Sequence, residues 1–148
     1  MINIRHTGIV TNDLKKSLIF WQKIIGFKIV NSLVEKSDLL DKVLGYKNVN
    51  VRTIKLKDTK NNLIELLYFI NSPSVKKKNI KPYTVGYTHI SITVKNISRI
   101  YKKLKANKIK FNAVPQKSSD NKVKMTYCRT PEGAFLELVE ELWVLDLI

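Results

Sequence analysis

The amino-acid sequence predicts an α+β fold made of two βαβββ modules, which together form a mostly antiparallel half-barrel sheet. Both halves of the 148-residue chain show one strand, one amphipathic helix and three further strands in the same order. An aperiodic stretch with lysines and prolines separates the halves. The two histidines of the chain occupy matching positions, one in each half. One such module has too little core to be stable alone, so we expect a single domain over residues 1–148.

The first module is expected at residues 1–70. Residues 2–10 predict a strand because they are rich in β-branched side chains. The helix that follows has an apolar face of residues at helical spacing: Leu14, Leu18, Trp21 and Ile25. Asn12 or Asp13 is the expected N-cap, and Gly26 is expected to end the helix in a left-handed turn. The three remaining strands are expected at residues 27–35, 49–57 and 62–70.

The second module is expected at residues 86–141, after a linker at residues 71–85. Its helix is expected at residues 96–108. Four strands accompany this helix: residues 86–94, 109–114, 122–130 and 134–142. Residues 142–148 form an apolar tail, which is unusual for a terminus. The tail is expected to dock on the domain or on a second copy of the chain, and it favours a homodimer.

Each module places a histidine on its first strand and a glutamate on its last strand. Both glutamates lie between large apolar residues, so the period-two geometry of a strand sends them to the face opposite those neighbours. A lone strand histidine is usually structural, and a lone strand glutamate usually faces solvent, but matched pairs in a duplicated module favour a shared site. Two imidazoles and two carboxylates suit a borderline divalent cation. The sequence therefore predicts four metal ligands: His6, Glu65, His89 and Glu137.

Three segments resemble signatures of the vicinal oxygen chelate superfamily. The fold of this superfamily is called the glyoxalase/bleomycin-resistance/dioxygenase fold. They are HTGIVTNDLKKSLIFWQKIIGF in the first module, GYTHISITVKNI at the start of the second and PEGAFLELVE near its end. The resemblance covers residues 4–141. It implies paired βαβββ modules around one metal ion. The ligand positions of the superfamily carry over to the same four residues: His6, Glu65, His89 and Glu137.

A four-ligand site within this superfamily resembles those of glyoxalase I (lactoylglutathione lyase) and methylmalonyl-CoA epimerase. The resemblance implies a metal-dependent lyase or isomerase that chelates two vicinal oxygens of a small-molecule substrate, with thiol or CoA conjugates as candidates. An α-proton would shift through an enediolate, with Glu137 as the main base and Glu65 as the second. The expected cofactor is one divalent ion: Ni, Co, Zn, Mn or Fe. Two alternatives stay open, an extradiol-type ring-cleaving dioxygenase and a non-catalytic small-molecule-binding member.

Composition restricts the partners and the location of the chain. No run of about 18 apolar residues occurs and the N-terminus lacks the pattern of a signal peptide, so we expect a cytoplasmic protein without a membrane helix. The net charge of +15 comes mostly from lysines, which are usually solvated when scattered, so nucleic acid is not an expected partner. The single cysteine, Cys128, is expected to be a buried and inert thiol.

Overall fold

The computed structural model describes residues 1–71, 75 and 80–142 of the chain. The chain divides into two compact units, Met1–Lys76 and Lys77–Ile148. Each unit contains one four-stranded sheet that mixes parallel and antiparallel pairs, with few helices. The prediction of an α+β fold made of paired βαβββ modules is therefore confirmed.

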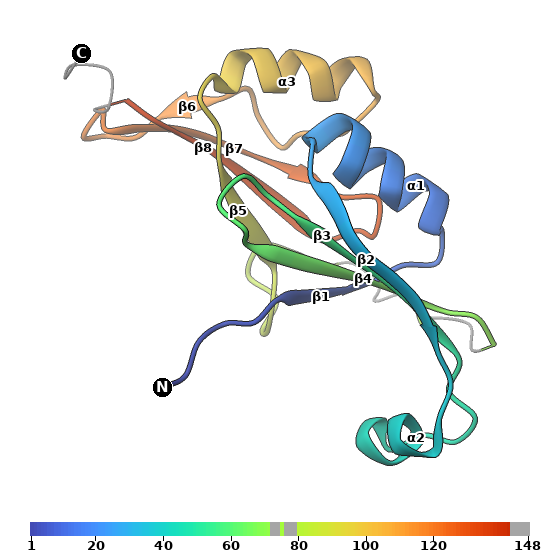
Figure 1. Cartoon of the computed structure of the whole chain (residues 1–148). Coiled ribbons are helices and arrows are strands. Elements are labelled where there is room, and N and C mark those ends of the chain that lie inside the picture. Colours follow the sequence, from blue (N-terminus) through green and yellow to red (C-terminus); the bar gives the residue numbers. More distant parts are fainter. Residues whose placement is uncertain (72–74, 76–79, 143–148) are drawn as a thin grey trace. The chain divides into compact units, whose positions relative to one another are not determined.

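The first unit runs through β1 (Thr7–Val10), α1 (Leu14–Leu18), the π-helix η1 (Ile19–Ile25), β2 (Lys28–Glu35), α2 (Asp38–Leu44), β3 (Val51–Lys57) and β4 (Leu63–Phe69). The strand order in its sheet is β1-β4-β3-β2, with β1 parallel to β4 and the other pairs antiparallel (Figure 1). Asp13 caps α1 by accepting a hydrogen bond from the backbone N–H of Lys16. Gly26 ends the helix with a φ of 100°, which a glycine adopts without the cost of a β-carbon. Both helix boundaries agree with the prediction.

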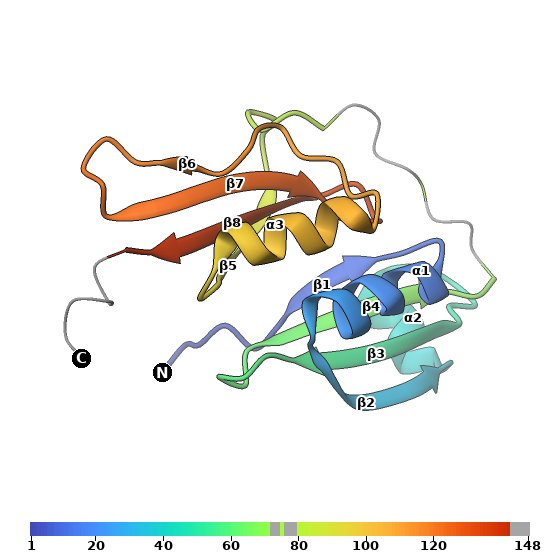
Figure 2. The same ribbon diagram turned by 90° about the horizontal axis from the view of Figure 1, so that it is seen from above.

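The second unit runs through β5 (His89–Thr93), α3 (Ile97–Ala106), β6 (Gln116–Lys117), β7 (Val123–Arg129) and β8 (Phe135–Glu141). Its strand order, β5-β8-β7-β6, repeats that of the first unit, and β5 is again parallel to its neighbour β8. The helix α3 packs against β8, as Figure 2 shows. The order of elements and the pairing of strands are thus the same in the two units, apart from the additional helix α2 in the first.

Two predicted strands differ from the structure. The first, predicted at residues 2–10, covers only Thr7–Val10, so His6 lies directly before β1 and not on it. Residues 109–114 were expected to form a strand, but the regular pairing with β7 begins only at Gln116, and the expected segment has one isolated bridge, from Phe111 to Cys128. Part of the pairing there is made by a side chain, because the Thr126 hydroxyl donates to the carbonyl oxygen of Ala113. The segment also leads into a proline at position 115, which has no N–H to donate to a neighbouring strand. These features replace a regular ladder with an irregular edge.

The strands of each unit separate an apolar face from a face that carries charged side chains. Ile64 and Leu66 on β4, and Leu136 and Leu138 on β8, are at most 5% exposed. In the first unit α1 packs against β4, and the adjoining Phe20 and Trp21 of η1 are fully buried. Alternation along a strand sends the glutamate between each apolar pair to the opposite face. The predicted orientation of the two glutamates is thus consistent with the burial of their neighbours.

Some expectations concern residues that the structure does not describe. Most of the linker interior and the tail beyond Leu142 lie outside the described residues, so the homodimer expected from that tail stays a prediction. Among the described residues, no helix has both the length and the apolar character needed to cross a membrane.

Candidate functional site

The first unit brings His6 and Glu65 together on one face of its sheet. In the parallel pairing of β1 with β4, Gly8 lies opposite Glu65, and His6 precedes Gly8 by two residues. A two-residue separation along extended chain keeps His6 on the same face as Glu65. The His6 Nε2 atom lies 3.1 Å from Glu65 Oε2, and the two side chains are 27% and 13% exposed. The pair is therefore largely buried but reachable from solvent.

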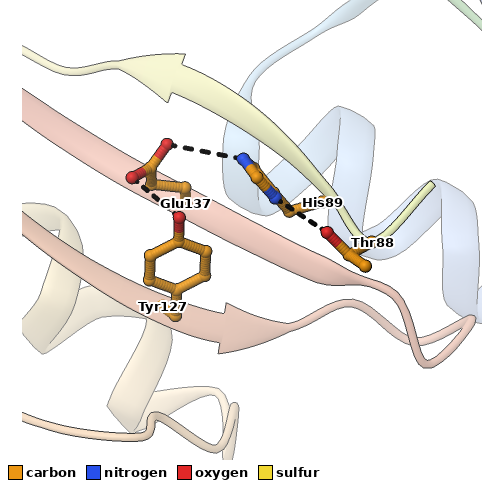
Figure 3. A network of polar contacts seen from close by, with 4 residues as sticks. All are labelled: Thr88, His89, Tyr127 and Glu137. Atoms are coloured by element: carbon orange, nitrogen blue, oxygen red, sulfur yellow. Dashed lines mark hydrogen bonds and ion pairs between the residues drawn. The ribbon is translucent and has the colours of Figure 1, made fainter. Parts of the chain in front are cut away.

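The second unit repeats this geometry with His89 and Glu137. Ser91 lies opposite Glu137 in the parallel pairing of β5 with β8, and His89 precedes Ser91 by two residues. The His89 Nε2 atom lies 3.9 Å from Glu137 Oε2, as Figure 3 shows. The side chains are 40% and 15% exposed. In both units the histidine thus lies two residues before the residue that is paired with the glutamate.

Each unit supplies one imidazole and one carboxylate of the four predicted ligands. Among the described residues of either unit, no three His, Cys, Asp or Glu side chains gather around a common point. Within one unit, the donors available to a cation are therefore the two that the sequence analysis named. A four-ligand centre requires donors from both units, and it stays a prediction.

No sequence pattern marks the residue that lies directly across the sheet from each glutamate. Lys55 on β3 is the antiparallel partner of Glu65, and its Nζ atom lies 3.5 Å from Glu65 Oε1. Tyr127 on β7 is the antiparallel partner of Glu137, and its hydroxyl donates a 2.9 Å hydrogen bond to Glu137 Oε1. Burial raises the pKa of Tyr127, and so do its hydrogen bond to Glu137 and the charge of that carboxylate. The phenol is therefore a neutral donor at physiological pH.

The two imidazoles differ in the environment of their second nitrogen. The Nδ1 atom of His89 lies 3.0 Å from the hydroxyl oxygen of Thr88, as Figure 3 shows. This contact orients the ring and leaves Nε2 on the side of Glu137. The Nδ1 atom of His6 is buried and has no hydrogen-bond partner among the described residues. In both cases Nε2 is the nitrogen nearest the carboxylate and the one available as a ligand.

Cys128 lies next to Tyr127 on β7, but on the apolar face of the strand. Its side chain is fully buried. Burial raises the pKa of the thiol from 9.0 to about 12, so almost none of it is thiolate at neutral pH. The expectation of a buried cysteine is confirmed, and its lack of reactivity stays a prediction.

The donor chemistry of the two pairs fits a borderline divalent metal ion. Imidazole nitrogen and carboxylate oxygen are the donors that Zn, Ni, Co, Mn and Fe accept. Two carboxylates would neutralise the charge of the ion, which lowers the cost of holding it away from bulk water. His6 and Glu65 would supply one nitrogen and one oxygen, and His89 and Glu137 would supply the other two. The residues present therefore fit the cofactor that the sequence analysis expects.

The chain is similar to proteins of known family. A curated lactoylglutathione lyase of Schizosaccharomyces pombe is 28% identical over 148 aligned residues, which cover 93% of this chain and 47% of that protein. The chain thus spans about half the length of this curated relative. Among solved structures, a glyoxalase family protein from Bacillus cereus superposes with a TM-score of 0.86 at 22% identity, covering 96% of this chain and 95% of that one. The trypanothione-dependent glyoxalase I of Leishmania major superposes with a TM-score of 0.66 at 18% identity, with 99% and 91% covered.

These structural similarities show the fold, since the sequences are less than 25% identical to this chain. A family model supplies the assignment itself. The model of the Glyoxalase/Bleomycin resistance protein/Dioxygenase superfamily matches residues 3–138, which is nearly the whole chain and includes all four predicted ligands. The chain belongs to the Glyoxalase/Bleomycin resistance protein/Dioxygenase superfamily.

Proposed function

We propose that the chain is a metal-dependent lyase or isomerase of the glyoxalase I or methylmalonyl-CoA epimerase type. The observation that carries the proposal is one histidine–glutamate pair in each unit, with the histidine two residues before the residue that pairs with the glutamate. Together the pairs offer two nitrogens and two oxygens to one divalent ion: Ni, Co, Zn, Mn or Fe. The similarity to a lactoylglutathione lyase supports the lyase form of the proposal.

In this proposal His6, Glu65, His89 and Glu137 would hold the ion, which when bound would supply Lewis-acid stabilisation of negative charge on two vicinal substrate oxygens. The protein residues hold the ion and move the proton. Glu137 removes the α-proton of the substrate: the C–H bond breaks, an O–H bond forms on the carboxylate, and the electron pair passes to the neighbouring carbonyl. In a lyase, Glu137 would return the proton to the neighbouring carbon while a second proton passes from the first enediolate oxygen to the other. In an epimerase, a second acid, for which Glu65 is the candidate, would donate a proton to the opposite face of the same carbon. Glu65 is the second candidate base.

The exposure of the two pairs is consistent with this division of work. Both glutamate side chains are at most 15% exposed, so each carboxylate is largely buried but keeps the partial contact with solvent that exchange of its proton requires. Both histidines are more exposed than their glutamates, so both imidazoles are reachable from solvent. Thiol or CoA conjugates are the proposed substrates. We also retain the proposals of a homodimer and of a cytoplasmic location.

The test is α-proton exchange in deuterated water, followed by NMR with the purified protein and added Ni²⁺ or Zn²⁺. The substrates are the hemithioacetal of methylglyoxal with glutathione, and methylmalonyl-CoA. The proposal predicts exchange that needs metal and stops with a chelator. Metal binding without exchange, but with oxygen consumption on catechols that depends on Fe²⁺, would favour a ring-cleaving dioxygenase instead. Absence of metal binding would favour a small-molecule-binding member without catalysis.

A further inference from the structure

We infer that Tyr127 is a positioning residue, which holds one oxygen of Glu137 so that the other is the single oxygen presented to the metal ion and to the substrate proton. The inference rests on the proposed function, because it concerns how the proposed base is held. Tyr127 itself is not a ligand or a base in this scheme.

The position of the Tyr127 hydroxyl is fixed by the sheet and by two aromatic neighbours. Tyr127 is the direct cross-strand partner of Glu137, and its hydroxyl donates to Glu137 Oε1 over 2.9 Å (Figure 3). The Tyr127 ring makes edge contacts with the rings of His89 and Phe135, with centroids 5.5 and 6.3 Å away. Such edge contacts favour a defined ring orientation. The hydroxyl is thus a donor whose place is set before any ligand binds.

The two oxygens of Glu137 consequently have different partners. Oε1 accepts from the Tyr127 hydroxyl, whereas Oε2 lies on the side of His89, 3.9 Å from Nε2. The terminal torsion of a glutamate is soft, so a carboxylate without such a bond rotates easily and exchanges its oxygens. With Oε1 held, Glu137 offers one oxygen beside the imidazole nitrogen. A metal ion bound there would be held through that single oxygen.

The first unit provides an independent copy of this arrangement. Lys55, at the register position equivalent to Tyr127, lies 3.5 Å from Oε1 of Glu65, and His6 lies 3.1 Å from Oε2. The cross-strand residue differs in chemistry between the two units, but in both it contacts the carboxylate oxygen that does not face the histidine. The common feature is therefore a donor on the strand beside the glutamate, which leaves Oε2 to the histidine. Surroundings of this kind orient ligands in metal sites, and their loss typically costs about 10- to 100-fold in metal affinity or activity.

The test compares Tyr127→Phe with Tyr101→Phe. The first change removes the hydroxyl and keeps the ring contacts with His89 and Phe135. Tyr101 lies on α3 and packs its ring on Phe111, with centroids 4.6 Å apart, so its variant controls for the loss of a tyrosine hydroxyl elsewhere in the same unit. Co²⁺ affinity and the visible absorption of the Co²⁺-loaded protein report the ligand geometry. The ¹³C signal of the Glu137 carboxyl in the metal-free protein, assigned with Glu137→Gln, reports the hydrogen bond without any metal.

We expect Tyr127→Phe to shift the ¹³C signal of the Glu137 carboxyl and to change the visible spectrum of the Co²⁺-loaded protein. The same variant should weaken Co²⁺ binding, or slow α-proton exchange of the methylglyoxal–glutathione hemithioacetal, by about 10-fold or more. Tyr101→Phe should match wild type in all of these. If wild type binds Co²⁺ and exchanges the proton but Tyr127→Phe behaves like Tyr101→Phe, the positioning role is refuted and the proposed function stands. If wild type binds no Co²⁺, the proposed function is refuted, and the positioning role falls with it.

Discussion

Replacing each glutamate by glutamine separates the two roles assigned to the carboxylates. Glu137→Gln is nearly isosteric, and the amide carbonyl can still accept the hydrogen bond that the Tyr127 hydroxyl gives to Glu137 in the wild type. The fold should therefore persist while the proton acceptor is lost. A general base contributes about 10²- to 10⁴-fold to the rate. At 1.36 kcal/mol for each factor of ten, this loss equals about 2.7 to 5.4 kcal/mol of activation free energy.

Glu65→Gln is the matched control, because Glu65 occupies the same register position in the other unit. This change removes the charge that faces Lys55 and His6, at 3.5 and 3.1 Å, but keeps an oxygen donor. We expect weaker metal binding and, at saturating metal, a loss of exchange at least about 10-fold smaller than that of Glu137→Gln, because the main base is intact.

The assay is the rate of α-deuterium incorporation into the hemithioacetal of methylglyoxal with glutathione, with metal content measured on the same samples. Thermal unfolding followed by circular dichroism checks that both variants are folded. Equal losses in the two variants at saturating metal would refute the assignment of Glu137 as the main base. A larger loss in Glu65→Gln would reverse the two roles.

Three further predictions concern the metal, the core and the thiol. His89→Ala should remove most of the bound divalent metal, measured by elemental analysis, and retention of a full equivalent would contradict the proposed ligand set. Leu138→Ala should lower the free energy of unfolding by about 2–5 kcal/mol, because the Leu138 side chain is fully buried. Leu39→Ala is the control: this side chain is 71% exposed, so the change should be less than about 0.5 kcal/mol. Urea unfolding measures both free energies. Cys128 should not react with a thiol reagent at pH 8 until the protein unfolds, because its pKa is raised to about 12. The Cys128 thiol has a lower pKa in the unfolded chain than in the folded protein, so its burial contributes fully to stability below about pH 9 and loses that contribution as the pH rises toward 12. Between these pH values, the unfolding free energy of the wild type should therefore fall more steeply than that of Cys128→Ala.

Most of the fold follows from the period of the apolar residues and from the repeat. Alternation around Glu65 and Glu137 predicts which face of β4 and β8 is buried, and the burial of their neighbours agrees. The irregular edge at residues 109–114 was not predicted, because apolar periodicity does not distinguish a regular strand from a segment that pairs with β7 through an isolated bridge and scattered backbone bonds. The π-helical geometry of η1 was also missed. Apolar residues spaced for an α-helix give no sign of the wider turn.

The histidine and glutamate of each pair could be found from sequence because both belong to short motifs that recur in the two halves. Lys55 and Tyr127 could not be found in this way, since no shared residue type marks their positions. Their place opposite the glutamates follows only from the register of the two hairpins, in which Lys57 pairs with Leu63 and Arg129 with Phe135. A shift of one residue in a turn would place Thr126 or Cys128 opposite the glutamate instead. Register is set by turn geometry, which sequence patterns constrain weakly.

The duplication also explains why a metal site would need both units. The chain has two histidines, one in each unit, and each stands beside a single glutamate. Two donors rarely hold a borderline cation tightly, whereas four are typical of a well-bound ion. The two halves supply equivalent ligands but unequal neighbours, because a cationic lysine faces one glutamate and a neutral tyrosine faces the other. An ammonium attracts its carboxylate over a range of orientations, whereas a phenol acts through one directional bond. In the proposed mechanism this difference supports a division of roles in which Glu65 stays with the metal ion while Glu137, beside the neutral tyrosine, carries the proton.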